Sequence, residues 1–267
     1  MDYLLVGVAV FIVLLFVFQR RRGRSLSGPV KGAQKVYAGP HEFRRAATQE
    51  FPDVDLAFYD QTQAWLERHG FRCLGDVEDT TASQAYPNMR TFLRVLLSND
   101  GTVMAACYHI NLRGWMKVLQ WIGLLPRVLK VLDLETEFND GTFLATSNSE
   151  GLDMLSEVPG HRKVQFPQAT AFDEMIEVHR SILAQWGGAD STYQPLRLSS
   201  LDDVLAAQNR SQQIASEYRQ KIGYISKEEM ARMAGGTMTV PARQLLSEFH
   251  KVRSGELEVE KPPPFEP

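Results

Sequence analysis

The densest group of chemically capable side chains is a row of three carboxylates, Asp133, Glu135 and Glu137, which alternate with apolar or hydroxyl residues. On a β-strand these residues share one face and stand about 6.5 to 7 Å apart along the strand. That separation suits acid–base catalysis or a cation site. The alternative is a solvated sheet face whose acids pair with Arg94 or Arg90 on a neighbouring strand.

The remaining candidates for chemistry are isolated. Cys107 and His109 lie two residues apart on a predicted strand, but no third group completes a catalytic set, which favours ordinary strand packing. His179 lies on the apolar face of a predicted helix and is interpreted as a core histidine. Residues 146–149, TSNS, offer hydroxyl and amide ligands or simply end a strand.

Several motif classes are missing from the sequence. It has no phosphate-binding Walker loop, no dinucleotide glycine pattern, no H-E-x-x-H pair and no G-x-S-x-G elbow. Cys73 and Cys107 show no C-x-x-C spacing and are interpreted as buried thiols rather than a disulfide. We therefore predict no catalytic residue, cofactor or metal, and the net charge of −3 gives no general basic field for nucleic acid.

A cationic amphipathic stretch covers residues 113–130. On a helix its polar residues form one narrow stripe beside a Trp- and Leu-rich face, although Pro126 breaks or kinks the helix. Such a helix suits the plane of a membrane interface. The alternatives are packing in the core, a lid over a ligand pocket, or a protein contact. The predicted membrane contacts are Arg113, Trp115, Lys117, Trp121, Arg127 and Lys130.

An uncharged apolar run covers residues 3–18 and is followed by arginines at 20–24. As a helix it is about 24 Å long, at the short end for a bilayer core of about 30 Å. Because the basic cluster follows the run, an uncleaved anchor is favoured over a signal peptide. The sequence thus predicts a single-pass protein of the cell (inner) membrane, with its N-terminus outside and its C-terminal domain cytoplasmic.

The intervening chain alternates between helical and strand patterns. Two pairs of apolar runs are joined by Ser98-Asn99-Asp100-Gly101 and by Asn139-Asp140-Gly141, and Asp-Gly is a strong hairpin signal. The predicted strands cover residues 71–74, 91–97, 102–110, 131–138, 142–147 and 163–166. The predicted helices cover residues 53–69, 170–186 and 200–222, with two short ones beginning at Ser226 and Pro241. Thr170 with Asp173, and Ser200 with Asp203, have the spacing of a capping box at the start of the two longer helices.

These patterns predict an α+β fold, an antiparallel meander sheet flanked by helices, with a helical C-terminal annex. The predicted boundaries are 1–24 for the anchor, 25–51 for a juxtamembrane linker, 52–188 for the α+β domain with an insertion at 112–130, 189–256 for the annex, and 257–267 for a flexible proline-rich tail.

The predicted function is a membrane-anchored intracellular binding or scaffold protein. It contacts the bilayer through residues 3–18 and 113–130 and a protein partner through 199–256. One alternative is a small-ligand or lipid-binding domain with 113–130 as its lid. The other is an enzyme on the Asp133/Glu135/Glu137 face, which requires those carboxylates to lie in a cleft with raised pKa values.

Overall fold

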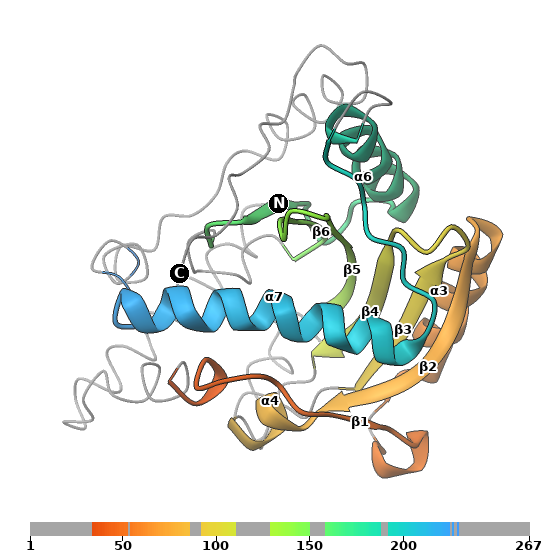
Figure 1. The fold of residues 1–267 in the computed structure, drawn as a ribbon. Helices are drawn as coiled ribbons and strands as arrows, with labels where there is room; N and C mark the ends of the chain where they lie inside the picture. The colour runs from red at the N-terminus through yellow and green to blue at the C-terminus, as the bar shows by residue number, and fades with distance from the viewer. Residues whose placement is uncertain are drawn as a thin grey trace, which may run out of the picture.

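The computed structural model describes residues 34–52, 54–85, 92–110, 129–149, 158–187, 192–224, 226 and 229. Within these ranges the chain forms one seven-stranded sheet and five helices (Figure 1). The strands are β1 (Phe43–Arg45), β2 (Phe71–Asp79), β3 (Phe92–Ser98), β4 (Met104–Ile110), β5 (Leu129–Glu137), β6 (Phe143–Ser147) and β7 (His161–Gln165). The helices are the 3₁₀ helix η1 (Thr48–Glu50), α3 (Leu56–Arg68), α4 (Thr80–Ala85), α6 (Phe172–Trp186) and α7 (Leu201–Lys221).

The strands lie in the sheet in their chain order, β1 to β7, and each pair is antiparallel except β6 and β7. The predicted α+β fold and its two Asp-Gly hairpins are thus confirmed, and the antiparallel meander holds from β1 to β6, whereas β7 joins the sheet in parallel. Gly101 and Gly141 adopt φ values of 78° and 80°, which residues with a Cβ rarely reach. In each turn the preceding aspartate accepts hydrogen bonds from the following threonine. The sequence Asn-Asp-Gly-Thr, which occurs at residues 99–102 and 139–142, therefore forms the same turn twice.

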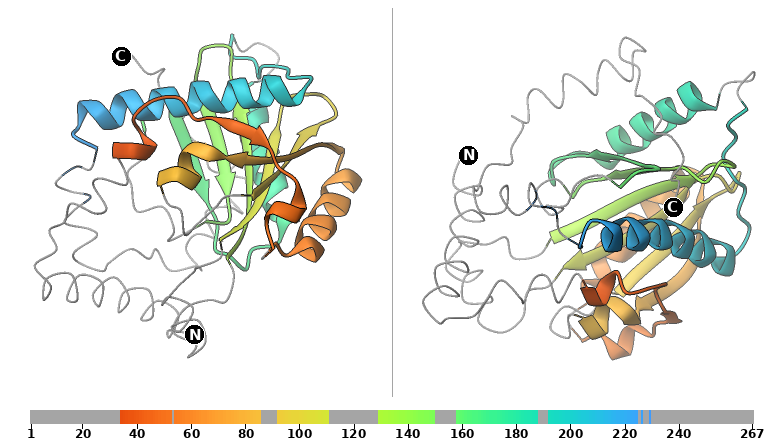
Figure 2. Two further views of the ribbon diagram at one scale, coloured as in Figure 1. Left: turned by 90° about the horizontal axis from the view of Figure 1, so that it is seen from below. Right: turned by 60° about the vertical axis from the view of Figure 1, so that its left-hand side comes forward.

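Helices cover both faces of the sheet (Figure 2). Helices α3 and α6 share a core with Leu96 of β3 and Leu132 of β5. Helix α7 packs on the other face, where its first turns contact Val95 and Met104. This arrangement follows from strand periodicity, because adjacent residues of one strand point to opposite faces. The second face, predicted to be wet along β5, lies under α7.

One extended segment, residues 192–200, connects α6 to α7 and ties both hairpin ends together. The backbone N–H of Asn139 donates to the Gln194 carbonyl at 2.9 Å, and that of Leu196 donates to the Glu137 carbonyl at 2.8 Å. Further along, the Leu198 N–H donates to the Gly101 carbonyl at 2.8 Å. These hydrogen bonds hold the segment against the ends of the strands and position the start of α7.

The caps of the two long helices differ from each other. Ser200 and Asp203 form the predicted capping box at the start of α7. The same pattern predicted at Thr170 and Asp173 is wrong, because α6 has Ala171 as its N-cap with no side-chain hydrogen bond. The Asp173 carboxylate instead lies 2.9 Å from Nε2 of His69, at the end of α3. A tertiary contact has replaced the local one.

Residues 25–51, predicted as a linker, contribute to the sheet. Phe43–Arg45 form β1, which pairs antiparallel with the end of β2. Three residues are too few to give a strand pattern in the sequence. The linker therefore supplies an edge strand.

Among the described residues, no helix is long and apolar enough to cross a membrane. This finding contradicts the prediction of a single-pass transmembrane protein. Residues 3–18, on which that prediction rested, lie outside the described residues.

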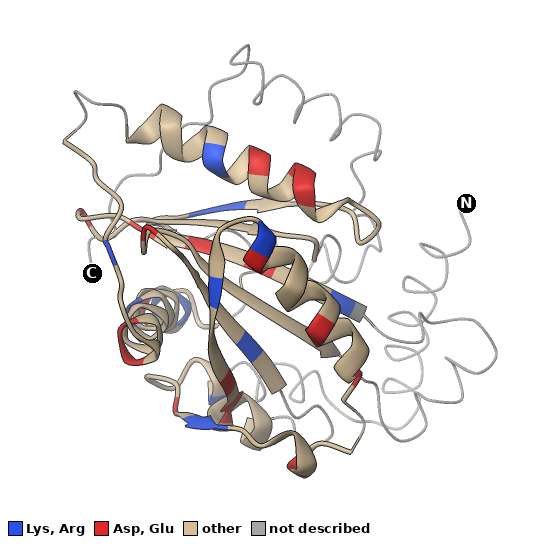
Figure 3. Cartoon of the chain, turned by 90° about the vertical axis from the view of Figure 1, so that its right-hand side faces the viewer, with Lys and Arg blue, Asp and Glu red and all other residues tan. Residues whose placement is uncertain are grey.

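Acidic and basic residues are interspersed over the elements in view in Figure 3. Helix α6, for example, exposes Asp173 and Glu177 together with Arg180. The described elements in this view therefore carry charges of both signs.

The two Asp-Gly turns provide a matched test of the contact with residues 192–200. A Cβ added at Gly101 would overlap the Leu198 carbonyl oxygen, whereas one at Gly141 meets no atom within 4 Å. Gly141→Ala should lower the free energy of unfolding by about 1 to 2 kcal/mol, the cost of the left-handed conformation. Gly101→Ala should cost about 1 to 3 kcal/mol more, because of the overlap. Urea unfolding of both variants checks this, and equal losses would show that the segment does not constrain the turn.

Candidate functional site

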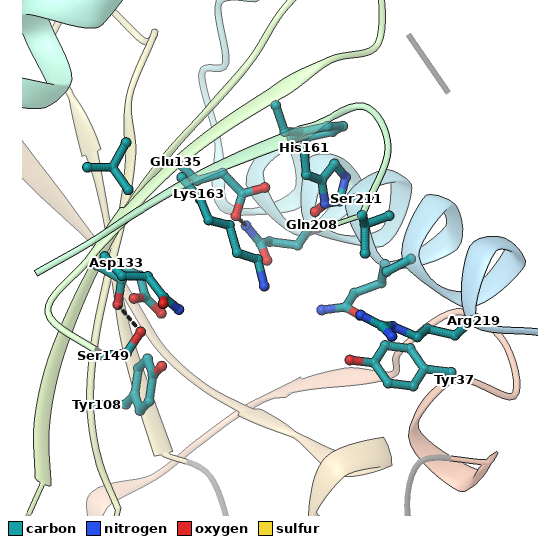
Figure 4. Close-up of a pocket in the computed structure, with 18 residues that line it drawn as sticks. Tyr37, Tyr108, Asp133, Glu135, Ser149, His161, Lys163, Gln208, Ser211 and Arg219 are labelled. Atoms are coloured by element: carbon teal, nitrogen blue, oxygen red, sulfur yellow. Dashed lines mark hydrogen bonds between the residues drawn. The ribbon is translucent and has the colours of Figure 1, made fainter. Parts of the chain in front are cut away.

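A cavity of about 460 Å³ lies between strands β4 to β7 and the second half of α7 (Figure 4). Its floor is formed by side chains on neighbouring strands, and two of them, Ala145 and Ser147, are small enough to leave space above the sheet. In the register of the sheet, Asp133 lies opposite Ser147, and Glu135 lies opposite Ala145. In the parallel pair of β6 and β7, Ala145 lies opposite Lys163, so Glu135, Ala145 and Lys163 form one row across three strands. The volume is within the range of small-molecule sites.

The carboxylate row of β5 forms part of this floor. Alternation predicted its common face correctly, but α7 covers that face. Arg94, the basic partner considered for the row, points to the opposite side of the sheet and bonds Asp76 and Asp60. The pairing of the row with Arg94 is therefore wrong, and Arg90 lies outside the described residues.

Glu137 is held in an ion pair. Nε and Nη2 of Arg210 each donate to one of its carboxylate oxygens, both at 2.6 Å. Glu137 is 5% exposed, so its charge is neutralised by α7. This bidentate pair connects the sheet to the middle of the helix and leaves Glu137 outside the cavity lining.

Glu135 has a different environment and lines the cavity. Its Oε2 accepts a hydrogen bond from the Gln208 amide at 2.9 Å, whereas its buried Oε1 has no hydrogen-bond partner among the described residues. Burial raises the pKa of Glu135, and the charge of Asp133 acts in the same direction, against hydrogen bonds from Gln208 and Ser211. In the neutral acid the proton belongs on Oε1, because Oε2 already accepts.

His161 is the second buried polar group of the cavity. It is 7% exposed, its ring contacts Phe143, and its Nε2 has no hydrogen-bond partner in the described part of the chain. Burial lowers the pKa of His161 to about 4, and nearby Lys163 acts in the same direction. At neutral pH the ring is uncharged and offers either a donor or an acceptor.

The opposite wall comes from the inward face of α7. Gln208, Ser211, Gln212, Ala215 and Arg219 follow one another at helical spacing and line the cavity. At the end of the wall Nη1 of Arg219 lies 2.6 Å from Oε1 of Glu229, and both side chains are at most 1% exposed. Sequence reasoning missed this wall, although polar residues interrupting the apolar face of a long helix were a usable signal.

The segment before β1 supplies Tyr37 to the lining. Nδ1 of His41 lies 2.6 Å from the Asp79 carboxylate, and its Nε2 lies 3.0 Å from the Val36 carbonyl. Both partners are acceptors, so only the protonated ring donates to both. Burial lowers the His41 pKa, but the hydrogen bond and charge of Asp79 outweigh it and the net pKa is raised. Gln220 of α7 also donates to the Tyr37 carbonyl.

The other sequence candidates have structural roles. His179 is buried and bonds the hydroxyls of Thr136 and Thr146, as expected of a core histidine. Nδ1 of His109 lies 2.8 Å from the Tyr59 hydroxyl. Burial raises the pKa of Cys107 to about 12, which argues against a thiolate nucleophile. Cys107 and Cys73 are both free thiols as predicted, but only Cys107 is buried, whereas Cys73 is half-buried.

The run TSNS at residues 146–149 is divided between these roles. Thr146 contacts His179, and Asn148 accepts from the Leu132 N–H and donates to the Lys130 carbonyl, which ends the strand pair. Ser147 and Ser149 line the cavity. Only the two serines therefore remain as ligand-binding candidates.

The predicted amphipathic insertion lies mostly outside the described residues, including Arg113, Trp115, Lys117, Trp121 and Arg127. Its last residue, Lys130, belongs to β5 rather than to a helix. The Lys130 ammonium lies 2.9 Å from the Asp55 carboxylate and over the ring of Phe58. Lys130 thus joins the sheet to the start of α3.

Comparisons with known proteins found no matching family model, no matching curated protein and no matching solved structure. The described residues contain no group of three or more His, Cys, Asp or Glu side chains that could hold a metal ion.

The two neighbouring glutamates should respond oppositely to the same change at pH 7. Burial raises the pKa of Glu135, so burying its charged form at pH 7 opposes folding. Glu135→Gln removes that charge, and the variant should be at least as stable as the parent. Glu137→Gln disrupts the pair with Arg210 and should cost about 1 to 3 kcal/mol.

Urea unfolding at pH 4 and pH 7 measures both effects. The stability contribution of Glu135 is present below its unfolded pKa and is lost as the pH rises through its folded pKa. The free energy of unfolding of Glu135→Gln, relative to that of the parent, should therefore increase between pH 4 and pH 7. A loss over that interval would show that Glu135 is charged and stabilised in the folded protein.

His41 should give the protein a stability component that is lost with rising pH. Its pKa is raised on folding, so the contribution is complete below the unfolded pKa of about 6.5 and is lost as the pH rises through the folded pKa. The difference in unfolding free energy between the parent and His41→Gln should accordingly shrink between pH 6 and pH 9. A difference that grows over that range would mean that the neutral ring makes these contacts.

Proposed function

We propose that this protein is a small-ligand-binding protein and that its site is the cavity between β4–β7 and α7. The observation that carries this proposal is the pair of buried polar atoms, Oε1 of Glu135 and Nε2 of His161, without hydrogen-bond partners among the described residues. Buried polar groups normally have partners, and an unsatisfied one costs about 1 to 3 kcal/mol. Both residues line the same cavity, where a ligand would supply partners.

Among the functions predicted from the sequence, this is the alternative of a ligand-binding domain, with one change. The lid was expected to be residues 113–130, but the described cavity is covered by α7. The predicted scaffold function depended on residues 3–18 and 113–130, and only residues 129–130 of these ranges are described. The geometry therefore supports the ligand-binding function better.

The enzyme alternative required the carboxylates to lie in a cleft with raised pKa values. Glu135 meets this requirement, since burial raises its pKa within the cavity. Glu137 does not line the cavity, and Arg210 occupies both of its oxygens. We therefore place an acid–base reaction at Glu135 and Asp133 as the second candidate function, which requires the same ligand site.

Filling the cavity without altering its polar groups tests the proposed function. Ala145 lies on the floor and is partly exposed, so Ala145→Phe should occupy ligand space. Ala184 is exposed on α6, on the far side of the sheet, and Ala184→Phe is the matched control.

The measurement is a thermal-shift screen of the full-length chain with neutral sugars, nucleosides, amino acids and carboxylic acids. A compound that raises the melting temperature of the parent and of Ala184→Phe should fail to do so with Ala145→Phe. Equal shifts in all three proteins would place binding outside this cavity and contradict the proposal.

A further inference from the structure

The charges around the cavity occur with both signs. Arg219 is paired with Glu229, and Asp133 and Lys163 bring opposite charges to the floor. Burial favours the neutral forms of Glu135 and His161. The walls thus present no excess of one sign, and charge complementarity favours neither an anion nor a cation.

The hydrogen-bonding groups of the lining are mainly of the kind that both donate and accept. Gln208 and Gln212 contribute amides, and Ser147, Ser149 and Ser211 contribute hydroxyls. Alcohol groups also donate and accept, whereas carboxylates and phosphates mainly accept and ammonium groups only donate. The lining is therefore chemically matched to several hydroxyl groups on one molecule.

The two unpaired atoms fit the same ligand. In its neutral form, which burial favours, Glu135 presents Oε1–H as a donor because Oε2 accepts from Gln208, and in its charged form Oε1 is an acceptor. Nε2 of His161 is a donor or an acceptor according to its tautomer. A hydroxyl group can satisfy either atom, since it accepts from one partner while it donates to another.

Aromatic side chains complete the lining. Tyr108 comes from β4 and Tyr37 from the segment before β1, and Figure 4 shows the two rings on opposite sides of the cavity. A tyrosine offers an apolar ring and a polar tip. The C–H face of a saturated ring can pack on such a surface while its hydroxyl groups contact the polar walls.

We propose that the cavity binds a neutral polyhydroxylated molecule of the sugar class through Glu135, His161 and the polar face of α7. This inference rests on the proposed ligand-binding function and specifies its ligand. The sugar is held by hydrogen bonds to groups that donate and to groups that accept. Among the described residues the cations that line the cavity, Lys163 and Arg219, both already have partners, so an added phosphate or carboxylate would have to compete for them.

Calorimetric titration of the full-length chain tests this assignment. The probes are neutral monosaccharides and disaccharides, the corresponding sugar phosphates and uronic acids, and free amino acids. At least one neutral sugar should bind, and its phosphorylated or oxidised form should bind about tenfold or more weakly, the loss expected for an unpaired charge or acceptor in a polar site.

Two adjacent glutamines of α7 supply the variant and its control. Gln212 lines the cavity, whereas Gln213 is exposed and donates to Glu217. Gln212→Leu should weaken sugar binding about tenfold, equivalent to one hydrogen bond, and Gln213→Leu should leave it unchanged. Circular dichroism confirms that both variants are folded. Equal affinities of the two variants for the sugar would overturn the assignment.

The outcomes separate this inference from the function on which it rests. If amino acids or the anionic sugars bind in a Gln212-dependent way and neutral sugars do not, the ligand class is wrong and the ligand-binding function stands. If nothing in the titration panel binds and the broader thermal-shift screen also gives no shift, both fail. Binding of a neutral sugar that Ala145→Phe abolishes supports both.

Discussion

Helix α7 determines the environment of the glutamates that β5 presents on the second face of the sheet. A strand that alternates Asp133, Glu135 and Glu137 with buried residues would ordinarily place its acids in water. Under a helix, each carboxylate must instead be paired or become neutral, since isolated buried charges are strongly unfavourable. Glu137 forms an ion pair with Arg210. Glu135 accepts a hydrogen bond from the Gln208 amide, and burial raises its pKa.

The same helix has an apolar half and a polar half. Leu201 and Val204 pack on the apolar side chains of β2 to β4, and the capping box at Ser200 fixes where this half begins. From Gln208 onward most of the inward residues are polar, Ala215 being the exception among those that line the cavity, and they face it over β5 to β7. The apolar half holds α7 on the sheet, so the polar half is positioned over a cavity rather than collapsing onto it.

Most of the strands and both hairpins were predictable because their signals are local, whereas the three-residue strand β1 was not. Alternation along β5 and the Asp-Gly pairs at Gly101 and Gly141 each lie within a few residues, and the structure confirms them. The position of α7 was not predictable, because it depends on hydrogen bonds between residues 192–200 and two distant turns. When the position of α7 is not known, the side of β5 that bears Glu135 appears exposed to solvent. Gln208 is then interpreted as a single polar residue on the apolar face of a helix.

A sheet face under a helix is most simply filled with apolar side chains, and the half near β2 to β4 is filled in this way. The other half contains His161, Glu135 and the ion pair of Arg219 with Glu229. Apolar residues of similar size would often stabilise such positions equally well or better, because desolvating polar groups opposes folding. Local departures from good packing are expected where a protein binds or reacts. The contrast between the two halves of one interface therefore supports a role in binding for the polar half.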